Sequence, residues 1–510
     1  MSHDLHELTN RLQQLDDRLV ACMKCGMCQA VCPVFAETLQ EGDVTRGKIT
    51  LLQNLAGKII RDAKGVQEKL NKCLLCGTCQ VNCPSGVNIM DIFFEARIIV
   101  NTYMGLSAIK KVILRGMLTR PKLFNMLLDI GSRFQGLIVT GKDETTGSSC
   151  SRFLTPVIGD RYFMPLAKNP LHREIPCLDT PAGKSGIKVA FYPGCLIDKM
   201  FPHIAKDIFK ILAYHEVGVF MPKGQACCGI PALSSGAKDA YDKLVALNIN
   251  AFSGHEFDYL LTACASCTST IKELWPKMAP NYPRDLREQI ESLAEKTLDV
   301  HEFIIDKLGV KPNNAAREQQ VKVTYHEPCH LGKSLGIKSQ PRDIIRLNPA
   351  YDFQEMAAAD RCCGCGGSFN LQHYNLSAKI GEHKRENIVR SGAKIAATSC
   401  PACMMQLADM LAKKHDDIQV RHSIELYAEM LPARPQRQER HGRQQRHSAA
   451  PVPAILLWIP KKYFFFLFSK YLPLFGLWPK KWIFLFMPFS CKTDVTLKTY
   501  CRRNTNRTLY

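Results

Sequence analysis

The sequence predicts a mixed α+β and α/β fold, in which a mainly helical N-terminal domain precedes a duplicated α/β domain. Two observations predict this organisation. One compact cysteine motif occurs twice within the first 84 residues, and a longer cysteine pattern occurs twice between residues 195 and 403. In the longer pattern the cysteines follow short apolar runs that alternate with helical stretches, as in parallel sheets with crossover helices.

The N-terminal motif reads C-x2-C-x2-C-x3-C-P at residues 22–33 and again at residues 73–84. This spacing lets three thiolates of one loop close on a [4Fe–4S] cube, while the fourth serves the neighbouring cube. A zinc ribbon or a disulfide knot needs neither the third and fourth cysteine at this spacing nor a second copy. We therefore expect a bacterial-type two-cluster ferredoxin domain over residues 1–115. The ligands of its two [4Fe–4S] clusters are predicted to be Cys22, Cys25, Cys28 and Cys83 for the first and Cys73, Cys76, Cys79 and Cys32 for the second.

Length, cysteine content and charge narrow the possible classes. A chain of 510 residues suggests about three domains. The 23 cysteines follow an N-terminus without an apolar signal segment, so we expect reduced cysteines in the cytoplasm. Of the net charge of +20, residues 433–510 carry +13, with fifteen Lys and Arg against two acidic residues. Because the basic excess belongs to the tail, we expect no nucleic-acid partner.

Apolar periodicity predicts three helices in the N-terminal domain, over residues 5–20, 49–60 and 87–115. Residues 116–186 have weak periodicity and many Pro, Gly and Ser residues, which predicts a connector. From residue 187 onward short apolar runs alternate with helical stretches, which predicts parallel sheets. The predicted strands are 188–192, 259–262, 321–325 and 394–398, and the predicted helices are 204–214 and 371–389.

The second cysteine system marks a duplication over residues 187–310 and 320–432. Its first set is Cys195, Cys227, Cys228, Cys264 and Cys267, and its second set is Cys329, Cys362, Cys363, Cys400 and Cys403. The spacing between equivalent cysteines is nearly constant, at 134 to 136 residues. Because these cysteines follow predicted strands, we expect them to meet at the carboxyl edge of a sheet. So many soft ligands favour a further iron–sulfur cluster, with zinc as the second choice.

This C…CCG…C-x-x-C pattern resembles the cysteine-rich CCG domain of heterodisulfide reductase subunits and of glycolate oxidase iron–sulfur subunits. Two ferredoxin motifs followed by two CCG domains look most like the glycolate oxidase iron–sulfur subunit. One subunit of anaerobic glycerol-3-phosphate dehydrogenase has a similar layout. The additional Cys365, next to the second Cys-Cys-Gly triplet, departs from the pattern and leaves the thiolate ligands of the second half open.

The resemblance implies an electron-transfer subunit of a cytosolic or membrane-associated complex. A separate FAD-containing subunit would oxidise glycolate or another 2-hydroxy acid, and this chain would relay the electrons to an acceptor such as quinone. The sequence agrees, because it has no G-x-G-x-x-G motif, and no catalytic acid or base is expected on this chain. Rival interpretations are catalysis of disulfide reduction by the CCG cluster, as in heterodisulfide reductases, and a metal-bound scaffold that assembles the complex.

Four single residues lie near the predicted sites. His203, His326 and His330 could ligate metal or relay protons, and we expect structural roles for them. Arg46 could tune a cluster, and we expect it to pair with an acid.

The tail, residues 433–510, is basic and rich in aromatic residues, and we expect it not to fold. Lysines interrupt every apolar run before it reaches the roughly 18 residues of a spanning helix. The tail could lie in a membrane interface, at the inner face of the membrane, or be the product of a frameshift; we favour the frameshift.

Overall fold

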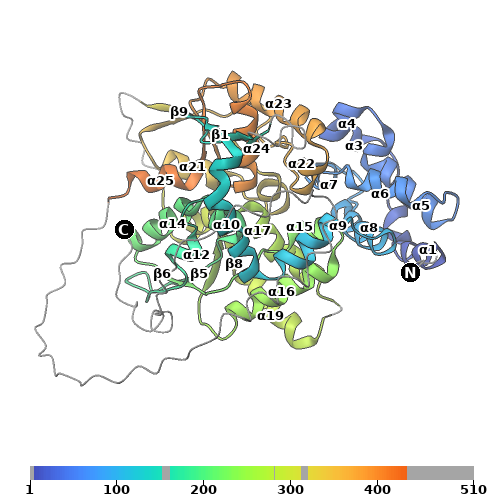
Figure 1. Ribbon diagram of the computed structural model, residues 1–510, viewed down its shortest axis with the longest axis horizontal. Coiled ribbons are helices and arrows are strands. Elements are labelled where there is room, and N and C mark those ends of the chain that lie inside the picture. The colour runs from blue at the N-terminus through green and yellow to red at the C-terminus, as the bar shows by residue number, and fades with distance from the viewer. Residues whose placement is uncertain (1–4, 152–160, 281, 312–319, 433–510) are drawn as a thin grey trace, which may run out of the picture. The chain divides into compact units, whose positions relative to one another are not determined.

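The computed structural model in Figure 1 describes residues 5–151, 161–280, 282–311 and 320–432. The predicted tail, residues 433–510, lies outside the described residues. The predicted fold class is confirmed: an N-terminal helical region precedes two sheets that are mainly parallel.

The N-terminal region is built from short helices around two cysteine loops. They are α1 (Leu5–Gln13), α2 (Asp16–Val20), α3 (Met27–Val31), α4 (Pro33–Thr38), η1 (Glu41–Asp43), α5 (Thr45–Ala56), α6 (Ala63–Asn71) and α7 (Thr78–Val81). The prediction of one helix over residues 5–20 is wrong, because a turn at Leu15 separates α1 from α2. The turn lets Leu12, Leu15 and Leu19 all reach the core, where each is at most 2 % exposed. The predicted helix over 49–60 begins earlier and ends at Ala56.

The predicted helix over residues 87–115 is also interrupted. It forms α8 (Ile89–Met104), then α9 (Ala108–Lys111) and the π-helical segment η2 (Val112–Leu118). The two parts meet at 114°. Gly105 ends α8 with a φ of 77°, a left-handed conformation that costs glycine little. Among the described helices, none alone has both the length and the apolar composition to cross a bilayer.

The stretch predicted as a connector contains regular structure of its own. Its elements are α10 (Pro121–Ile138), the antiparallel strands β1 (Val139–Lys142), β2 (Ser149–Ser151) and β3 (Tyr162–Phe163), α12 (Leu171–Glu174) and β4 (Leu178–Asp179). The prediction of weak periodicity is wrong for α10, whose apolar residues recur at helical spacing although several of them are exposed.

The first cysteine-rich half has a five-stranded sheet in the order β4-β6-β5-β7-β8. Its strands β5 (Lys188–Phe191), β6 (Gly218–Met221), β7 (Tyr259–Thr262) and β8 (Thr297–Asp299) are parallel, and β4 is antiparallel to β6. Its helices are α13 (Gly194–Lys199), α14 (Pro202–Tyr214), α15 (Ile230–Ser234), α16 (Lys238–Phe252), α17 (Ala265–Ser269), η3 (Thr270–Leu274), α18 (Trp275–Lys277), α19 (Arg284–Lys296), α20 (Val300–Glu302) and η4 (Phe303–Lys307).

The second half repeats this plan with a four-stranded sheet in the order β10-β9-β11-β12. Its strands β9 (Val321–His326), β10 (Tyr351–Phe353), β11 (Ile395–Thr398) and β12 (Gln419–His422) are all parallel. Its helices are η5 (His330–Ser334), α21 (Ser339–Arg346), α22 (Ser368–Gln372), α23 (Tyr374–Arg390), α24 (Pro401–Ala412) and α25 (Ser423–Met430). The predicted helix over 371–389 breaks at His373, between α22 and α23.

The two halves share one strand order, since β5, β6, β7 and β8 correspond to β9, β10, β11 and β12. They also contact each other through equivalent elements. The Ala265 N–H at the start of α17 donates to the Ser399 carbonyl at 3.2 Å, and His422 Nε2 lies 3.0 Å from the Ala263 carbonyl oxygen. The ends of β7 and β11, which the fourth cysteine of each set follows, therefore lie side by side.

Candidate metal centres

The first N-terminal cavity is surrounded by the four cysteines predicted for the first cluster. Its lining includes Cys22, Cys25, Cys28 and the distant Cys83. Lys24 and Gly26 both adopt positive φ, which turns the loop so that its cysteines face one cavity. Gly26 has a φ of 91°, a conformation that favours glycine, and a Cβ there would lie 2.7 Å from the Nη1 end of the flexible Arg46 side chain.

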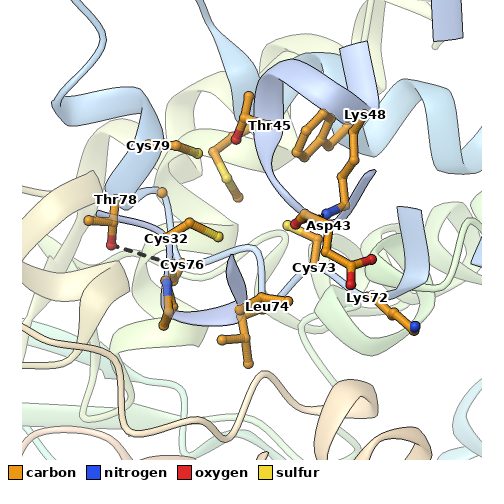
Figure 2. Close-up of a pocket in the computed structure, with 15 residues that line it drawn as sticks. Cys32, Asp43, Thr45, Lys48, Lys72, Cys73, Leu74, Cys76, Thr78 and Cys79 are labelled. Atoms are coloured by element: carbon orange, nitrogen blue, oxygen red, sulfur yellow. Dashed lines mark hydrogen bonds between the residues drawn. The ribbon is translucent and has the colours of Figure 1, made fainter. Parts of the chain in front are cut away.

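The second cavity has the same construction (Figure 2). Cys32, Cys73, Cys76 and Cys79 line it, and Figure 2 shows their side chains around one space. Each cavity is therefore lined by three cysteines of one loop and one of the other. Four thiolates around one cavity are the donor set of a [4Fe–4S] cluster. Burial raises the pKa of Cys32 to about 11. Because a ligand must be a thiolate, loading this site with metal releases protons.

The two cavities differ in the cations beside them. Arg46, beside the first cavity, pairs with Glu41, its Nε lying 2.6 Å from Oε1, as expected from the sequence. Beside the second cavity Lys48 is buried and donates to the Asp43 carbonyl, and burial lowers the pKa of Lys48. Arg97 is buried as well and donates to the Cys73 carbonyl at 2.8 Å. Sequence reasoning missed both buried cations.

The loop of the second cavity packs directly on the second cysteine-rich half. Leu74 of this loop and Cys362 share one small apolar core. A Cβ on Gly366 would lie 2.6 Å from Leu74 Cδ2, so the contact requires a residue without a side chain. Lys333 Nζ donates to Thr78 Oγ1 at 2.8 Å. The Cys362 thiol, together with burial, raises the pKa of Cys76. The second half is therefore the neighbour of the second cavity, as the contact of α4 with α23 also shows (Figure 1).

The first half meets the N-terminal region through α8 instead. Arg97 Nη1 donates to the Ser234 carbonyl and Asn101 Nδ2 to the Ser235 carbonyl, each at 2.7 Å. These bonds join the C-terminal end of α15 to α8 and involve no cysteine of the first set.

The ten cysteines predicted for the two halves lie close together in the structure. Each thiol interacts directly with the next, in the order Cys76, Cys362, Cys363, Cys403, Cys400, Cys264, Cys267, Cys228, Cys227 and Cys195, with Cys329 joining at Cys362. The series starts at a ligand predicted for the second [4Fe–4S] cluster and crosses from one half to the other between Cys400 and Cys264. Within each half, five thiols converge at the carboxyl edge of the sheet.

Cys365 replaces a packing residue of the first half. The Cys365 backbone N–H donates to the Cys363 thiol, and the Ile230 N–H does the same for Cys228. Cys365 thus stands where the first half has Ile230. Burial raises the pKa of Cys365, as expected for a thiol in an apolar position.

The three histidines singled out by the sequence have different surroundings. His203 is half exposed and lies 3.7 Å from a Glu425 carboxylate oxygen, away from the cysteines. His330 Nδ1 shares a hydrogen bond of 3.0 Å with Ser266 Oγ, and its Nε2 lies 3.3 Å from the Leu75 carbonyl. His330 therefore ties together both halves and the loop of the second cavity. His326 is buried against Cys363 and Cys403.

Comparisons with known proteins agree with these sites. The family model of the 4Fe-4S dicluster domain matches residues 18–87, and that of the cysteine-rich domain matches residues 189–272 and 323–408. The chain is therefore an iron–sulfur protein with one dicluster domain and two cysteine-rich CCG domains.

The chain is also similar to several curated iron–sulfur proteins. The chain is 27% identical to the probable glycolate oxidase iron-sulfur subunit of Bacillus subtilis over 431 residues, which cover 79% of this chain and 92% of the relative. It is 29% identical to one subunit of the fumarate reductase (CoM/CoB) of Methanothermobacter marburgensis, over 80% of this chain and 72% of that protein. Lactate utilization protein A 2 of Bacillus cereus is 29% identical over 48% of this chain and 99% of its own length. The resemblance to the glycolate oxidase iron–sulfur subunit is confirmed, and these relatives support an iron–sulfur role in an oxidoreductase with a catalytic partner subunit.

Proposed function

We propose that the chain is the iron–sulfur electron-transfer subunit of a glycolate, or other 2-hydroxy acid, oxidase or dehydrogenase complex. An FAD-containing partner subunit oxidises the substrate, and this chain relays electrons to an acceptor such as quinone. One observation carries the proposal: the sulfurs continue from the second N-terminal cavity through both cysteine-rich halves. A relay needs such a series, whereas a scaffold does not.

The residues of this chain have distinct tasks in that relay. The eight N-terminal cysteines hold two [4Fe–4S] clusters, which supply one-electron transfer when bound. The two five-cysteine sets hold a further iron centre each. Cys25 is exposed, so the first cavity faces outward and is the natural contact for the flavoprotein. Lys48 and Arg97 place positive charge beside the second cavity, which favours the reduced, more negative state of a cluster there.

The test is purification with the native partner under anaerobic conditions, followed by assay against three substrates. Glycolate oxidation with quinone reduction is the expected result, and lactate is the nearest alternative in view of the Bacillus cereus relative. Oxidation of glycerol 3-phosphate would instead assign the chain to the glycerol-3-phosphate dehydrogenase type. Cys76→Ser should abolish quinone reduction while the complex still assembles; retained activity would favour the scaffold.

One observation favours a second candidate, a catalytic subunit of the heterodisulfide reductase type. The methanogen relative is named a fumarate reductase that uses CoM and CoB. If this candidate is right, the isolated chain oxidises reduced viologen in a disulfide-dependent reaction. If the relay is right, disulfides have no effect on viologen oxidation.

The relay to a quinone places the chain at the inner face of the membrane, and one surface suits that position. The described residues of α9, η2 and α10 expose apolar side chains, and η2 contacts α10. The most exposed are Ile109, Val112, Ile113, Met126, Ile130 and Phe134. Five exposed basic residues accompany them, namely Lys111, Arg115, Arg120, Lys122 and Arg133, of which Arg115 pairs with Asp239. Apolar side chains with adjacent cations are the pattern of a helix lying in an anionic membrane surface.

Sedimentation with vesicles tests this surface. The full chain should bind phosphatidylglycerol vesicles, bind phosphatidylcholine vesicles weakly, and dissociate at high salt. Ile109→Asp with Val112→Asp should reduce binding about tenfold or more. Leu371→Asp is the matched control, since Leu371 is as exposed, at 69%, but lies on α22. If Leu371→Asp reduces vesicle binding as much as the double variant does, or if the wild type binds neither lipid, a membrane role for α9 and η2 is excluded.

A further inference from the structure

A histidine of the second half lies among its cysteines without a use in the proposed relay. His326 is the last residue of β9, and its side chain is 1% exposed. One ring nitrogen and the sulfurs of Cys363 and Cys403 lie within 4.8 Å of one another. Within the described part of the chain, neither ring nitrogen has a hydrogen-bond partner of normal geometry. A buried imidazole with unused nitrogens beside two thiols is the donor set of a metal site.

The surroundings of the ring prepare it for ligation. The His326 side chain is enclosed by the second half, and among the described residues no group accepts or donates a hydrogen bond of normal geometry at either ring nitrogen. A nitrogen lone pair therefore remains available to a metal held by the neighbouring thiolates.

The first half differs at the equivalent position. Tyr192 precedes His326 by 134 residues, as Cys195 precedes Cys329, and it too is buried beside the cysteines. Its hydroxyl donates to the Ala226 carbonyl at 2.6 Å. The Tyr192 hydroxyl is thus engaged in a hydrogen bond, whereas the His326 ring nitrogens are not. A histidine beside the cysteines is thus a feature of the second half, since the first half has a tyrosine at that position.

We propose that His326 is a nitrogen ligand of the iron centre held by Cys363 and Cys403, so that the second half has a mixed nitrogen–sulfur centre and the first half has thiolate ligands alone. This inference rests on the proposed function, in which both halves hold iron. Replacing thiolate by imidazole raises the reduction potential of an iron–sulfur centre. The second half is therefore the more oxidising of the two.

Nitrogen coupling in the full chain tests the ligand. Protein purified anaerobically with 15N-labelled histidine should show a strongly coupled 15N nucleus in pulsed EPR of the paramagnetic cysteine-rich centre. His326→Tyr, which installs the side chain of the first half, should remove that coupling, and so should His326→Gln. Tyr192→Phe should leave it unchanged. Iron K-edge X-ray absorption, which needs no paramagnetic state, should lose a nitrogen neighbour in the same two variants.

Iron content separates the two hypotheses. Iron beyond that of two [4Fe–4S] clusters, together with no histidine nitrogen in the first coordination shell, would overturn the ligand while leaving the relay intact. Weak coupling, typical of a hydrogen bond to sulfur, would overturn it equally. No iron beyond two [4Fe–4S] clusters, or zinc in the cysteine-rich halves, would overturn the proposed iron centres themselves and the ligand with them.

Discussion

The two cysteine-rich halves have the same strand order and the same five cysteine positions, but different polar side chains beside the sulfurs. The first half has Tyr192 and Asn248 where the second has His326 and Lys384. Asn248 is neutral and donates to the Cys227 carbonyl at 3.0 Å, whereas the Lys384 ammonium donates to the Ala358 carbonyl at 2.6 Å. The thiols of Cys362 and Cys363 partly offset the effect of burial on the pKa of Lys384. A duplicated scaffold thus keeps its cysteine positions while the charge around them changes, and it is the second half that packs on the loop of the second cavity.

Removing one cysteine from each half gives the largest expected difference. Cys363→Ser and Cys228→Ser should each lower the affinity of their own half for iron at least about 100-fold, since a ligand matters more than its outer partners. Because the second half lies between the N-terminal clusters and the first half, Cys363→Ser should also stop reduction of the first half. Cys228→Ser should leave the second half reducible. An EPR redox titration of each variant measures this, and the opposite pattern would reverse the proposed order.

Acid should destabilise the junction of the halves through His422. This histidine stands where the first half has Asp299, and each accepts a hydrogen bond from the backbone N–H two residues later. Burial, together with His301, lowers the pKa of His422 to about 4. Between pH 6.5 and 4 the unfolded chain takes up a proton that the folded chain excludes, so stability falls with falling pH, by about 3 kcal/mol at most.

His422→Asn can still accept the backbone N–H but does not titrate. Chemical denaturation at pH 7 and pH 5 should therefore show a smaller acid loss in His422→Asn than in the wild type. An unchanged acid loss would mean that another group is responsible.

Exchanging the buried cation should shift the potential of the second half alone. Lys384→Asn places the neutral side chain of the first half beside Cys362 and Cys363. Removing one positive charge at this separation should lower the reduction potential of the second centre by about 100 mV. The first centre should shift little. Redox titration followed by EPR measures both potentials, and equal shifts in the two halves would show that Lys384 acts through the fold.

The smallest effect on iron content is expected from replacing Cys365, which has no equivalent cysteine in the first half. Cys365 occupies the position of Ile230, so Cys365→Ala should remove packing and leave the iron content unchanged within about twofold. Iron analysis of the purified variant is sufficient. A loss of iron as large as that in Cys363→Ser would show that Cys365 is a ligand, and the second half would then have one cysteine ligand more than the first.

The sequence predicts what local spacing determines. The doubled C-x2-C-x2-C-x3-C-P motif predicts that Cys83 and Cys32 each serve the cluster of the other loop, and in the structure each lines the corresponding cavity. The constant offset of the second cysteine pattern predicted two repeated α/β halves. The helix over 87–115 was predicted too long, because Gly105, which has a positive φ at the end of α8, is a helix-ending signal that the apolar pattern alone does not reveal.

What the sequence left out depends on contacts between distant segments. Nothing in the sequence around Lys384 or Arg97 distinguishes a buried cation from an exposed one on a helix. The contact between the Cys76 and Cys362 thiols depends on how the second half packs against the N-terminal loops. His326 was expected to be structural, because the absence of a hydrogen-bond partner can be recognised only in three dimensions.

The magnetic interaction between centres tests the order of the relay most directly, because it depends on distance rather than on potential. In the fully reduced protein we predict spin–spin coupling between the cluster at Cys32, Cys73, Cys76 and Cys79 and the centre of the second half. The coupling should persist in Cys228→Ser and disappear in Cys363→Ser. Coupling that survives Cys363→Ser and disappears in Cys228→Ser would contradict the account.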